Sequence, residues 1–183
     1  RTGRPAPRDS GPGGESAALR DFICGMADIS RRSSAEVAEK LDLATYCRML
    51  DLGGGPATSS IVFCQRYPEL TCVVLDLEGP IAIAREEIER AGLSDRIRTL
   101  VGDYLVDDFG RDYDLVYISN IIHSLSPEET ALIFRKTYQA LIPGGTVVVK
   151  DFLMEDDRIT PPSSALFSVN MLVGTAGGKS YAL

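Results

Sequence analysis

Apolar residues follow two alternating periods along the chain from residue 47 onward. Short runs rich in aliphatic and β-branched residues predict strands, and segments with apolar positions three or four apart predict the helices between them. The predicted strands cover 47–52, 71–77, 96–103, 113–119 and 146–152. Because strand and helix alternate throughout, the sequence predicts an α/β fold with a doubly wound (Rossmann-like), mainly parallel sheet and right-handed crossovers.

The predicted helices carry start and stop signals of their own. The first spans 57–67 and is stopped by Pro68, and the second begins near Pro80. Ser126 and Glu129 form a capping box for the third helix. Its buried stripe is expected at Ala131, Phe134, Tyr138 and Leu141.

The segment before residue 47 has a different composition. Residues 1–16 are rich in Pro, Gly and Arg and offer little to bury, so we expect a disordered lead or linker there. Apolar spacing then predicts a helix around 19–26, and Ser33 with Glu36 predicts a second helix start by a capping box. At 183 residues and 44% hydrophobic content, the chain suits one compact domain.

Charge and cysteine content narrow the function classes. The net charge is −7 and no basic stripe occurs, so we expect no binding of nucleic acid or of acidic membranes. Four scattered cysteines and one histidine make no zinc-ligand set, so we expect no metal. No stretch resembles a signal peptide, and the longest uncharged run, 159–178, is broken by prolines and glycines. These features predict a soluble cytoplasmic protein with reduced thiols.

A glycine-rich loop follows the first predicted strand, in the stretch LDLGGGPA. A dinucleotide-binding loop would read GxGxxG, but after Gly53 and Gly55 the third glycine is replaced by Thr58. A nucleoside triphosphate loop would need a lysine, and none occurs in 51–67. Because Asp51 would repel a pyrophosphate, the loop favours a cationic or neutral ligand.

Asp51, Asp76 and Asp103 lie at the ends of the first three predicted strands. The carboxyl ends of parallel strands meet at one edge of a sheet, so we expect the three carboxylates to face one crevice. Unpartnered carboxylates are costly there, and a ligand with an ammonium, a ribose diol and an adenine amine would supply donors. S-adenosylmethionine carries all three groups. The alternative is that each acid is solvated and caps the next helix.

Five motifs, in this order, resemble a known family. LDLGGGPA, VVLDL, VGDYL, YDLVYISNIIHSLSPEE and LIPGGTVVVKDFL are similar to class I S-adenosylmethionine-dependent methyltransferases, specifically small-molecule O-methyltransferases of the plant caffeate and bacterial polyketide type. The similarity covers about residues 20–183. It implies S-adenosylmethionine as cofactor and a hydroxylated small aromatic or polyketide-like acceptor. The cofactor contacts that it implies are Asp51, Gly53 and Gly55 at the methionine end, Asp76 at the ribose, Asp103 and Tyr104 at the adenine, and Leu77 and Ser119 elsewhere.

His123 is the only histidine and follows the fourth predicted strand. With a strand order of 3-2-1-4-5, the fourth and fifth strands end side by side, so Asp151 could approach the imidazole and orient it. Methyl transfer to a hydroxyl needs a base that removes the hydroxyl proton. The resemblance places His123 on the family's catalytic histidine and Asp151 on a flanking acid, although Ser124 and Leu125 replace the Asp and Trp of the family motif.

The resemblance also describes the two ends of the chain. It implies that 17–46 hold helices of an N-terminal dimerisation region, which would form a homodimer, and that 47–183 form the catalytic domain without the family's last two strands. It places Asn170 and Met171 on a helix that lines the acceptor pocket, where core packing with Phe167 is the alternative. Hydroxylation or decarboxylation with the same cofactor, or a noncatalytic cofactor-binding or dimerisation module, are the alternative functions.

Overall fold

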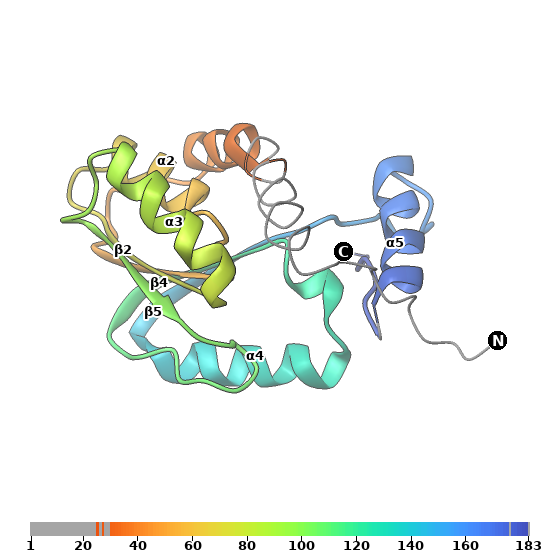
Figure 1. Cartoon of the computed structure of the whole chain (residues 1–183). Coiled ribbons are helices and arrows are strands. Elements are labelled where there is room, and N and C mark those ends of the chain that lie inside the picture. The colour runs from red at the N-terminus through yellow and green to blue at the C-terminus, as the bar shows by residue number, and fades with distance from the viewer. Residues whose placement is uncertain (1–24, 26, 28–29, 176, 183) are drawn as a thin grey trace, which may run out of the picture.

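Five parallel strands form one sheet at the centre of the molecule (Figure 1). The computed structural model describes residues 25, 27, 30–175 and 177–182. The strand order is β3-β2-β1-β4-β5, which confirms the predicted doubly wound α/β fold. The strands are β1 (Arg48–Leu52), β2 (Thr71–Asp76), β3 (Ile97–Val101), β4 (Tyr113–Ser119) and β5 (Leu141–Lys150).

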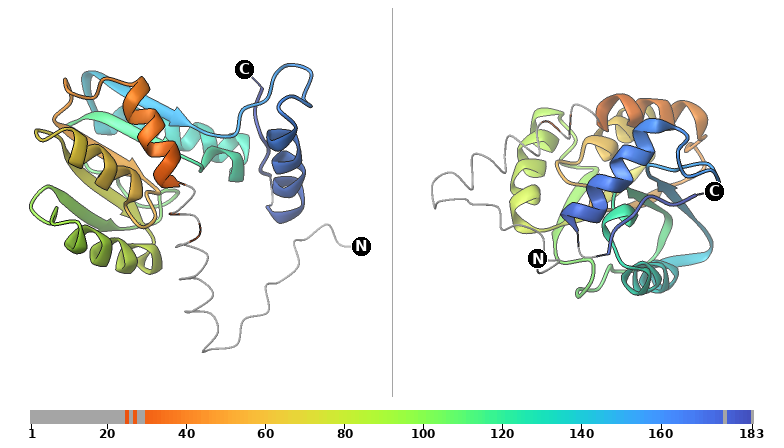
Figure 2. Two further views of the ribbon diagram at one scale, coloured as in Figure 1. Left: turned by 90° about the horizontal axis from the view of Figure 1, so that it is seen from above. Right: turned by 90° about the vertical axis from the view of Figure 1, so that its right-hand side faces the viewer.

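Helices cover both faces of the sheet and connect its strands except β3 and β4, which a loop joins, so the predicted alternation of strand and helix is interrupted there. Helices α2 and α3 lie on one face and α4 lies on the other, whereas α5 stands to one side of these layers (Figures 1 and 2). A short 3-10 helix, η1, precedes α4. The bounds are α2 (Thr58–Arg66), α3 (Glu78–Arg90), η1 (Ile122–Ser124), α4 (Pro127–Ala140) and α5 (Pro162–Gly174).

The side chains of β1 alternate between two buried clusters. Met49 belongs to the cluster beneath α2 and α3, which includes Ile81. Leu50 and Leu52 belong to the cluster beneath α4, which includes Ile133. Because successive residues of a strand point to opposite faces, the residue between the two leucines points toward α2. The sheet therefore directs the acidic side chain of Asp51 into the space between the sheet and α2, next to the loop that follows β1.

The predicted buried stripe of α4 is wrong. The predicted capping box is present, since Ser126 and Glu129 each bond the backbone of the other. However, Phe134 is 40% exposed and Tyr138 is 82% exposed. The buried residues of the helix are Ile133, Thr137 and Ala140. Two apolar stripes run one position apart along this helix, and periodicity alone cannot tell which of them faces the sheet.

The predicted helix start at Ser33 is also wrong. One helix runs over 30–40 without a break, and the Ser33 hydroxyl donates a hydrogen bond to the carbonyl of Ser30 at 3.1 Å. The side chain thus bonds back within the helix instead of capping it. Most of the helix expected around 19–26 lies outside the described residues. Among the residues that are described, no helix is both long and apolar enough to cross a membrane.

Candidate active site

The loop after β1 turns sharply at the carboxyl edge of the sheet. Gly53 (φ 62°) and Gly55 (φ 56°) adopt the left-handed conformation that favours glycine. The N–H of Gly53 donates to the carbonyl of Leu75 at 2.7 Å, which ties the loop to β2. A Cβ added to Gly54 would lie 2.7 Å from Cγ of Asp51, so the packing requires a third glycine. Only the run of three glycines signals this in the sequence, and Gly54 was not among the predicted site residues.

Asp51 lies beneath this loop, with 1% of the residue exposed. The Ser60 hydroxyl, on α2, donates a hydrogen bond to Oδ2 of Asp51 at 2.7 Å. Burial raises the pKa of Asp51 to about 6; the Ser60 hydrogen bond opposes this shift, and the charge of Asp76 adds to it. The carboxylate therefore supports the glycine loop from below and links it to α2. Sequence reasoning did not find Ser60.

Asp76, at the end of β2, contacts the glycine loop directly. The N–H of Gly55 donates to its Oδ2 at 2.8 Å, and the N–H of Leu77 donates to its Oδ1 at 2.7 Å. Burial raises the pKa of Asp76, and the two backbone hydrogen bonds oppose that shift. Leu77 itself is 54% exposed. The structure thus brings Gly55, Asp76 and Leu77, three of the predicted cofactor residues, into one cluster.

Asp103 and Tyr104 follow β3 and complete this side of the site. Oδ1 of Asp103 accepts a hydrogen bond from the N–H of Leu105 at 2.8 Å. A Cβ on Gly53 would lie 3.6 Å from Cε1 of Tyr104, so the phenol ring adjoins the glycine loop. Burial raises the pKa of Tyr104, and the charges of Asp76 and Asp103 add to the shift. The aromatic ring therefore lies near the acids predicted to bind the ribose and the adenine.

Ser119 lies at the same carboxyl edge of the sheet, on the side of β1 opposite to β2. It is the last residue of β4 and pairs in register with Lys150 of β5. The next residue, Asn120, has a left-handed backbone (φ 57°) and is held twice by Lys150. Its N–H donates to the Lys150 carbonyl at 2.9 Å, and the Lys150 ammonium donates to its Oδ1 at 3.0 Å. These bonds fix the ends of β4 and β5 relative to each other.

His123 and Asp151 meet just beyond these strand ends. Nδ1 of His123 lies 2.6 Å from Oδ1 of Asp151, and the main-chain N–H of His123 donates to Oδ2 at 3.1 Å. Their side chains are 11% and 6% exposed. Burial raises the pKa of Asp151, but the hydrogen bonds from His123 and from the N–H of Phe152 outweigh it, so this pKa lies below its usual value. An ionised carboxylate thus holds the imidazole.

The residues predicted to contact the acceptor lie on α5. Asn170 is exposed and Met171 is half-buried. Phe167, one turn earlier, packs against the imidazole of His123, with ring centroids 4.7 Å apart. Phe167 and Met171 belong to neither of the two buried clusters of the sheet, so the alternative of plain core packing does not hold for them. Nothing in the sequence pattern signals that Phe167 reaches the histidine.

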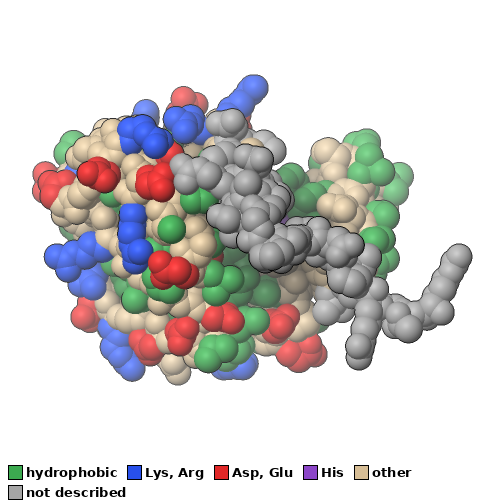
Figure 3. All heavy atoms as spheres, viewed as in Figure 1, with side chains coloured by type: hydrophobic (Ala, Val, Ile, Leu, Met, Phe, Trp, Pro, Cys, Tyr) green, Lys and Arg blue, Asp and Glu red, His purple; other side chains and the backbone are tan. Residues whose placement is uncertain are grey.

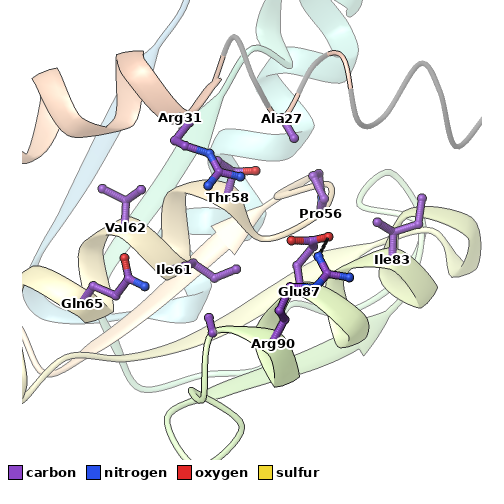
Figure 4. A pocket seen from close by; sticks show the side chains of 11 residues that line it. Ala27, Arg31, Pro56, Thr58, Ile61, Val62, Gln65, Ile83, Glu87 and Arg90 are labelled. Carbon is purple, nitrogen blue, oxygen red and sulfur yellow. Dashed lines mark hydrogen bonds and ion pairs between the residues drawn. The ribbon is translucent and has the colours of Figure 1, made fainter.

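A cavity of about 430 Å³ lies elsewhere, between α2 and α3 (Figure 4). Pro56 and Thr58 line it beside the glycine loop, and Arg90 reaches it with its ion-pair partner Glu87. It contains none of the predicted site residues. Within the described part of the chain, no three His, Cys, Asp or Glu side chains are grouped so that they could hold a metal ion.

Comparisons with known proteins agree with this arrangement. A family model described as an O-methyltransferase domain matches residues 13–182. The 3-hydroxy-5-methyl-1-naphthoate 3-O-methyltransferase of Streptomyces sahachiroi is 35% identical over 160 residues, which cover 87% of this chain and 46% of that protein. The L-tyrosine C(3)-methyltransferase of Streptomyces lavendulae is 34% identical over 161 residues, with coverage of 87% and 44%.

A solved structure of PigF with SAH (S-adenosylhomocysteine) shares the fold. PigF is described as an S-adenosyl-L-methionine-dependent methyl transferase of a Serratia species. Its TM-score is 0.85 at 26% identity, over 91% of this chain and 50% of that one. The chain thus spans about half the length of the relatives that it matches. Because the family model covers nearly all of its residues, the chain belongs to the O-methyltransferase domain family.

Proposed function

We propose that the chain is the cofactor-binding and catalytic part of an S-adenosylmethionine-dependent methyltransferase that acts on a hydroxyl of a small aromatic or polyketide-like molecule. The observation that carries the proposal is the His123–Asp151 pair, which stands at the carboxyl edge of the sheet. The glycine loop and Asp76 lie at the same edge. A proton acceptor and a candidate nucleoside site are therefore neighbours.

The residues after the first three strands fit the cofactor. A Cβ on Gly55 would meet nothing within 4 Å, so a methionine tail can approach the loop backbone closely there. At Gly53 the corresponding space holds the side chain of Ile121, so this glycine would contribute its backbone alone. Each carboxylate oxygen of Asp76 accepts one backbone N–H and keeps a lone pair for a ribose hydroxyl. Tyr104 offers a half-buried aromatic ring, and Asp103 offers an acceptor for the adenine amine. The relative solved with SAH supports this cofactor class.

Three further residues complete the proposed cofactor site. Leu77, which is largely exposed beside Asp76, offers an apolar surface to the adenosine. Ser119 offers a hydroxyl at the end of β4. The negative charge of Asp51 lies directly beneath the loop and favours a cationic methionine end above it.

The His123–Asp151 pair supplies the proton chemistry. When bound, the cofactor provides an electrophilic methyl group on its sulfonium. An ionised carboxylate only accepts hydrogen bonds, so Nδ1 of His123 carries the ring proton and Nε2 holds the free lone pair. We expect Nε2 to take the proton of the acceptor hydroxyl, which makes that oxygen nucleophilic. Asp151 then stabilises the imidazolium, while Asn170 and Met171 contact the acceptor.

The names of the relatives support an aromatic acceptor. One is named for a hydroxynaphthoate and methylation at oxygen, and another for tyrosine and methylation at C(3). The second name makes methylation of an aromatic carbon the second candidate, because the same base could deprotonate the phenol. Hydroxylation, decarboxylation and a noncatalytic role have no such support. The homodimer and the cytoplasmic location stay predictions.

Methyl transfer itself is the test of this proposal. The protein is incubated with methyl-labelled S-adenosylmethionine and a panel of phenols and hydroxynaphthoic acids. We expect S-adenosylhomocysteine and a labelled methyl ether in equal amounts with at least one acceptor. Label bound to ring carbon would support the second candidate. Absence of S-adenosylhomocysteine above background with every acceptor would contradict both.

A further inference from the structure

Helix α5 touches the rest of the molecule through a narrow part of its surface. It stands to one side of the sheet and its covering helices (Figure 2). Leu166 and Val173 are 72% and 71% exposed, and hydrophobic side chains are visible over this helix in Figure 3. Its one fully buried residue is Ser164. The side chain by which α5 reaches the proposed catalytic pair is Phe167.

Three aromatic rings form a corner at this point. The rings of Phe152 and Phe167 are stacked, with centroids 4.1 Å apart and planes 27° apart. The imidazole of His123 stands at 90° to Phe167, with centroids 4.7 Å apart, and lies 6.0 Å from Phe152. These distances form a nearly right-angled triangle with its corner at Phe167. The imidazole therefore lies beside the edge of Phe167, whose face is occupied by Phe152.

The contact with Phe167 restrains a tilt of the His123 ring that the hydrogen bond to Asp151 does not prevent. The hydrogen bond to Asp151 fixes the position of Nδ1 of His123. One hydrogen bond at one ring atom still allows the imidazole to tilt about that atom, which would swing Nε2 away from an acceptor. An edge-to-face aromatic contact resists such a tilt, because aromatic rings prefer defined mutual orientations. Phe152 is linked to the same pair through its main chain, because its N–H donates to Oδ1 of Asp151 at 2.8 Å.

We propose that Phe167 is a positioning residue that holds the imidazole plane of His123 and thereby makes the geometry of the catalytic pair depend on the seating of α5. The inference rests on the proposed function and adds a role for α5. Asn170 and Met171, the proposed acceptor contacts, follow Phe167 on the same helix. A substrate that contacts Asn170 and Met171 would therefore affect the position of His123 through the ring of Phe167.

The single histidine of the chain makes the test direct. In protein labelled with ¹⁵N at histidine, without a histidine tag, all imidazole signals belong to His123. Four variants are compared: Phe167→Ala, Phe167→Leu, which keeps apolar bulk, Phe167→Tyr, which keeps the ring, and Leu166→Ala, the matched control on the exposed face. The readouts are the Nδ1 proton signal, kcat and KM with a hydroxynaphthoic acid, and the affinity for S-adenosylmethionine.

We expect Phe167→Ala and Phe167→Leu to shift the imidazole signals and to broaden the Nδ1 proton signal through exchange with water. Their kcat should fall about tenfold or more, because small misplacements of a reacting group are costly, with the cofactor affinity unchanged. Phe167→Tyr should keep the imidazole signals and kcat of the wild type, because it keeps the ring. Leu166→Ala should change neither of these two readouts. Unchanged imidazole signals in Phe167→Leu, or changed signals with full kcat, would overturn the proposal. If the wild type transfers no methyl group, the proposed function fails, whereas the imidazole signals still decide the role of Phe167.

Discussion

Oδ1 of Asp151 lies 2.6 Å from Nδ1 of His123, although 28 residues separate them in the chain. The two side chains come from η1 and from the segment that follows β5. They meet because β4 and β5 are paired at the edge of the sheet, not because of a local motif. The contact gives the neutral imidazole one defined tautomer, in which Nε2 holds the free lone pair.

Asp151→Asn tests the contribution of the carboxylate. An amide is nearly the same size, but it stabilises the imidazolium less and can present an N–H to Nδ1, which favours the wrong tautomer. We expect kcat to fall at least about tenfold, with the affinity for S-adenosylmethionine unchanged. Asp156→Asn, at an exposed carboxylate, is the control. A variant with wild-type kcat would show that the hydrogen bond has no part in the reaction.

Asp76→Ala should weaken cofactor binding. A hydrogen bond to a charged group contributes about 1.5–3 kcal/mol, so we expect the Kd for S-adenosylmethionine to rise about 10- to 150-fold in calorimetry. The loss includes the bond from Gly55, which holds the glycine loop in place. Asp95→Ala, at an exposed position beyond α3, should bind as the wild type does. Equal affinities of the two variants would rule out the ribose contact.

Asp51 should make the stability of the protein depend on pH. Its pKa is raised from 3.8 to about 6 in the folded chain, so the folded state holds the proton more tightly than the unfolded chain. Its contribution to the unfolding free energy therefore falls as the pH rises from about 4 to 6, by an amount on the order of 3 kcal/mol. Asp51→Asn removes this dependence, and Asp156→Asn is again the control.

Urea unfolding at pH 4 and at pH 7 measures this effect. The unfolding free energy of Asp51→Asn, relative to that of the wild type, should be higher at pH 7 than at pH 4. A relative stability that does not change between the two pH values would mean that folding does not raise the pKa of Asp51.

Gly54→Ala should destabilise the fold and disturb the loop. The added Cβ would lie 2.7 Å from Cγ of Asp51 and 2.8 Å from Cγ1 of Val74, and both neighbours are packed beneath the loop. Overpacking of this kind costs about 1–3 kcal/mol of unfolding free energy. Gly174→Ala, where a Cβ meets nothing within 4 Å, should stay within about 1 kcal/mol of the wild type. Thermal unfolding of both variants is the measurement, and equal melting temperatures would contradict the packing argument.

The order of elements was predictable because each strand and helix carries its own local pattern. The predicted strands 71–77 and 113–119 and the capping box at Ser126 are examples, since the structure has β2 over Thr71–Asp76, β4 over Tyr113–Ser119 and the capping box. The phase of α4 was not predictable, because two apolar stripes compete along it and the sheet selects Ile133 over Phe134. Local pattern therefore specifies elements, whereas packing decides which face is buried.

The candidate site divides in the same way. The acids Asp76 and Asp103 stand at strand ends that the sequence marks clearly, so their placement at one edge of the sheet followed from the parallel pairing of β2 and β3. The partners that hold the site together did not follow, because Ser60 and Phe167 come from helices whose apolar or small-residue patterns carry no sign of the contact. Such contacts depend on how whole elements pack.

Replacement of His123 tests the central claim most directly. His123→Ala and His123→Gln are compared with the wild type for kcat with a hydroxynaphthoic acid and for calorimetric affinity to S-adenosylmethionine. A general base contributes roughly 10²- to 10⁴-fold to the rate, so we expect a loss of kcat of that size with the cofactor affinity unchanged. Full kcat in either variant would contradict His123 as the proton acceptor of the reaction.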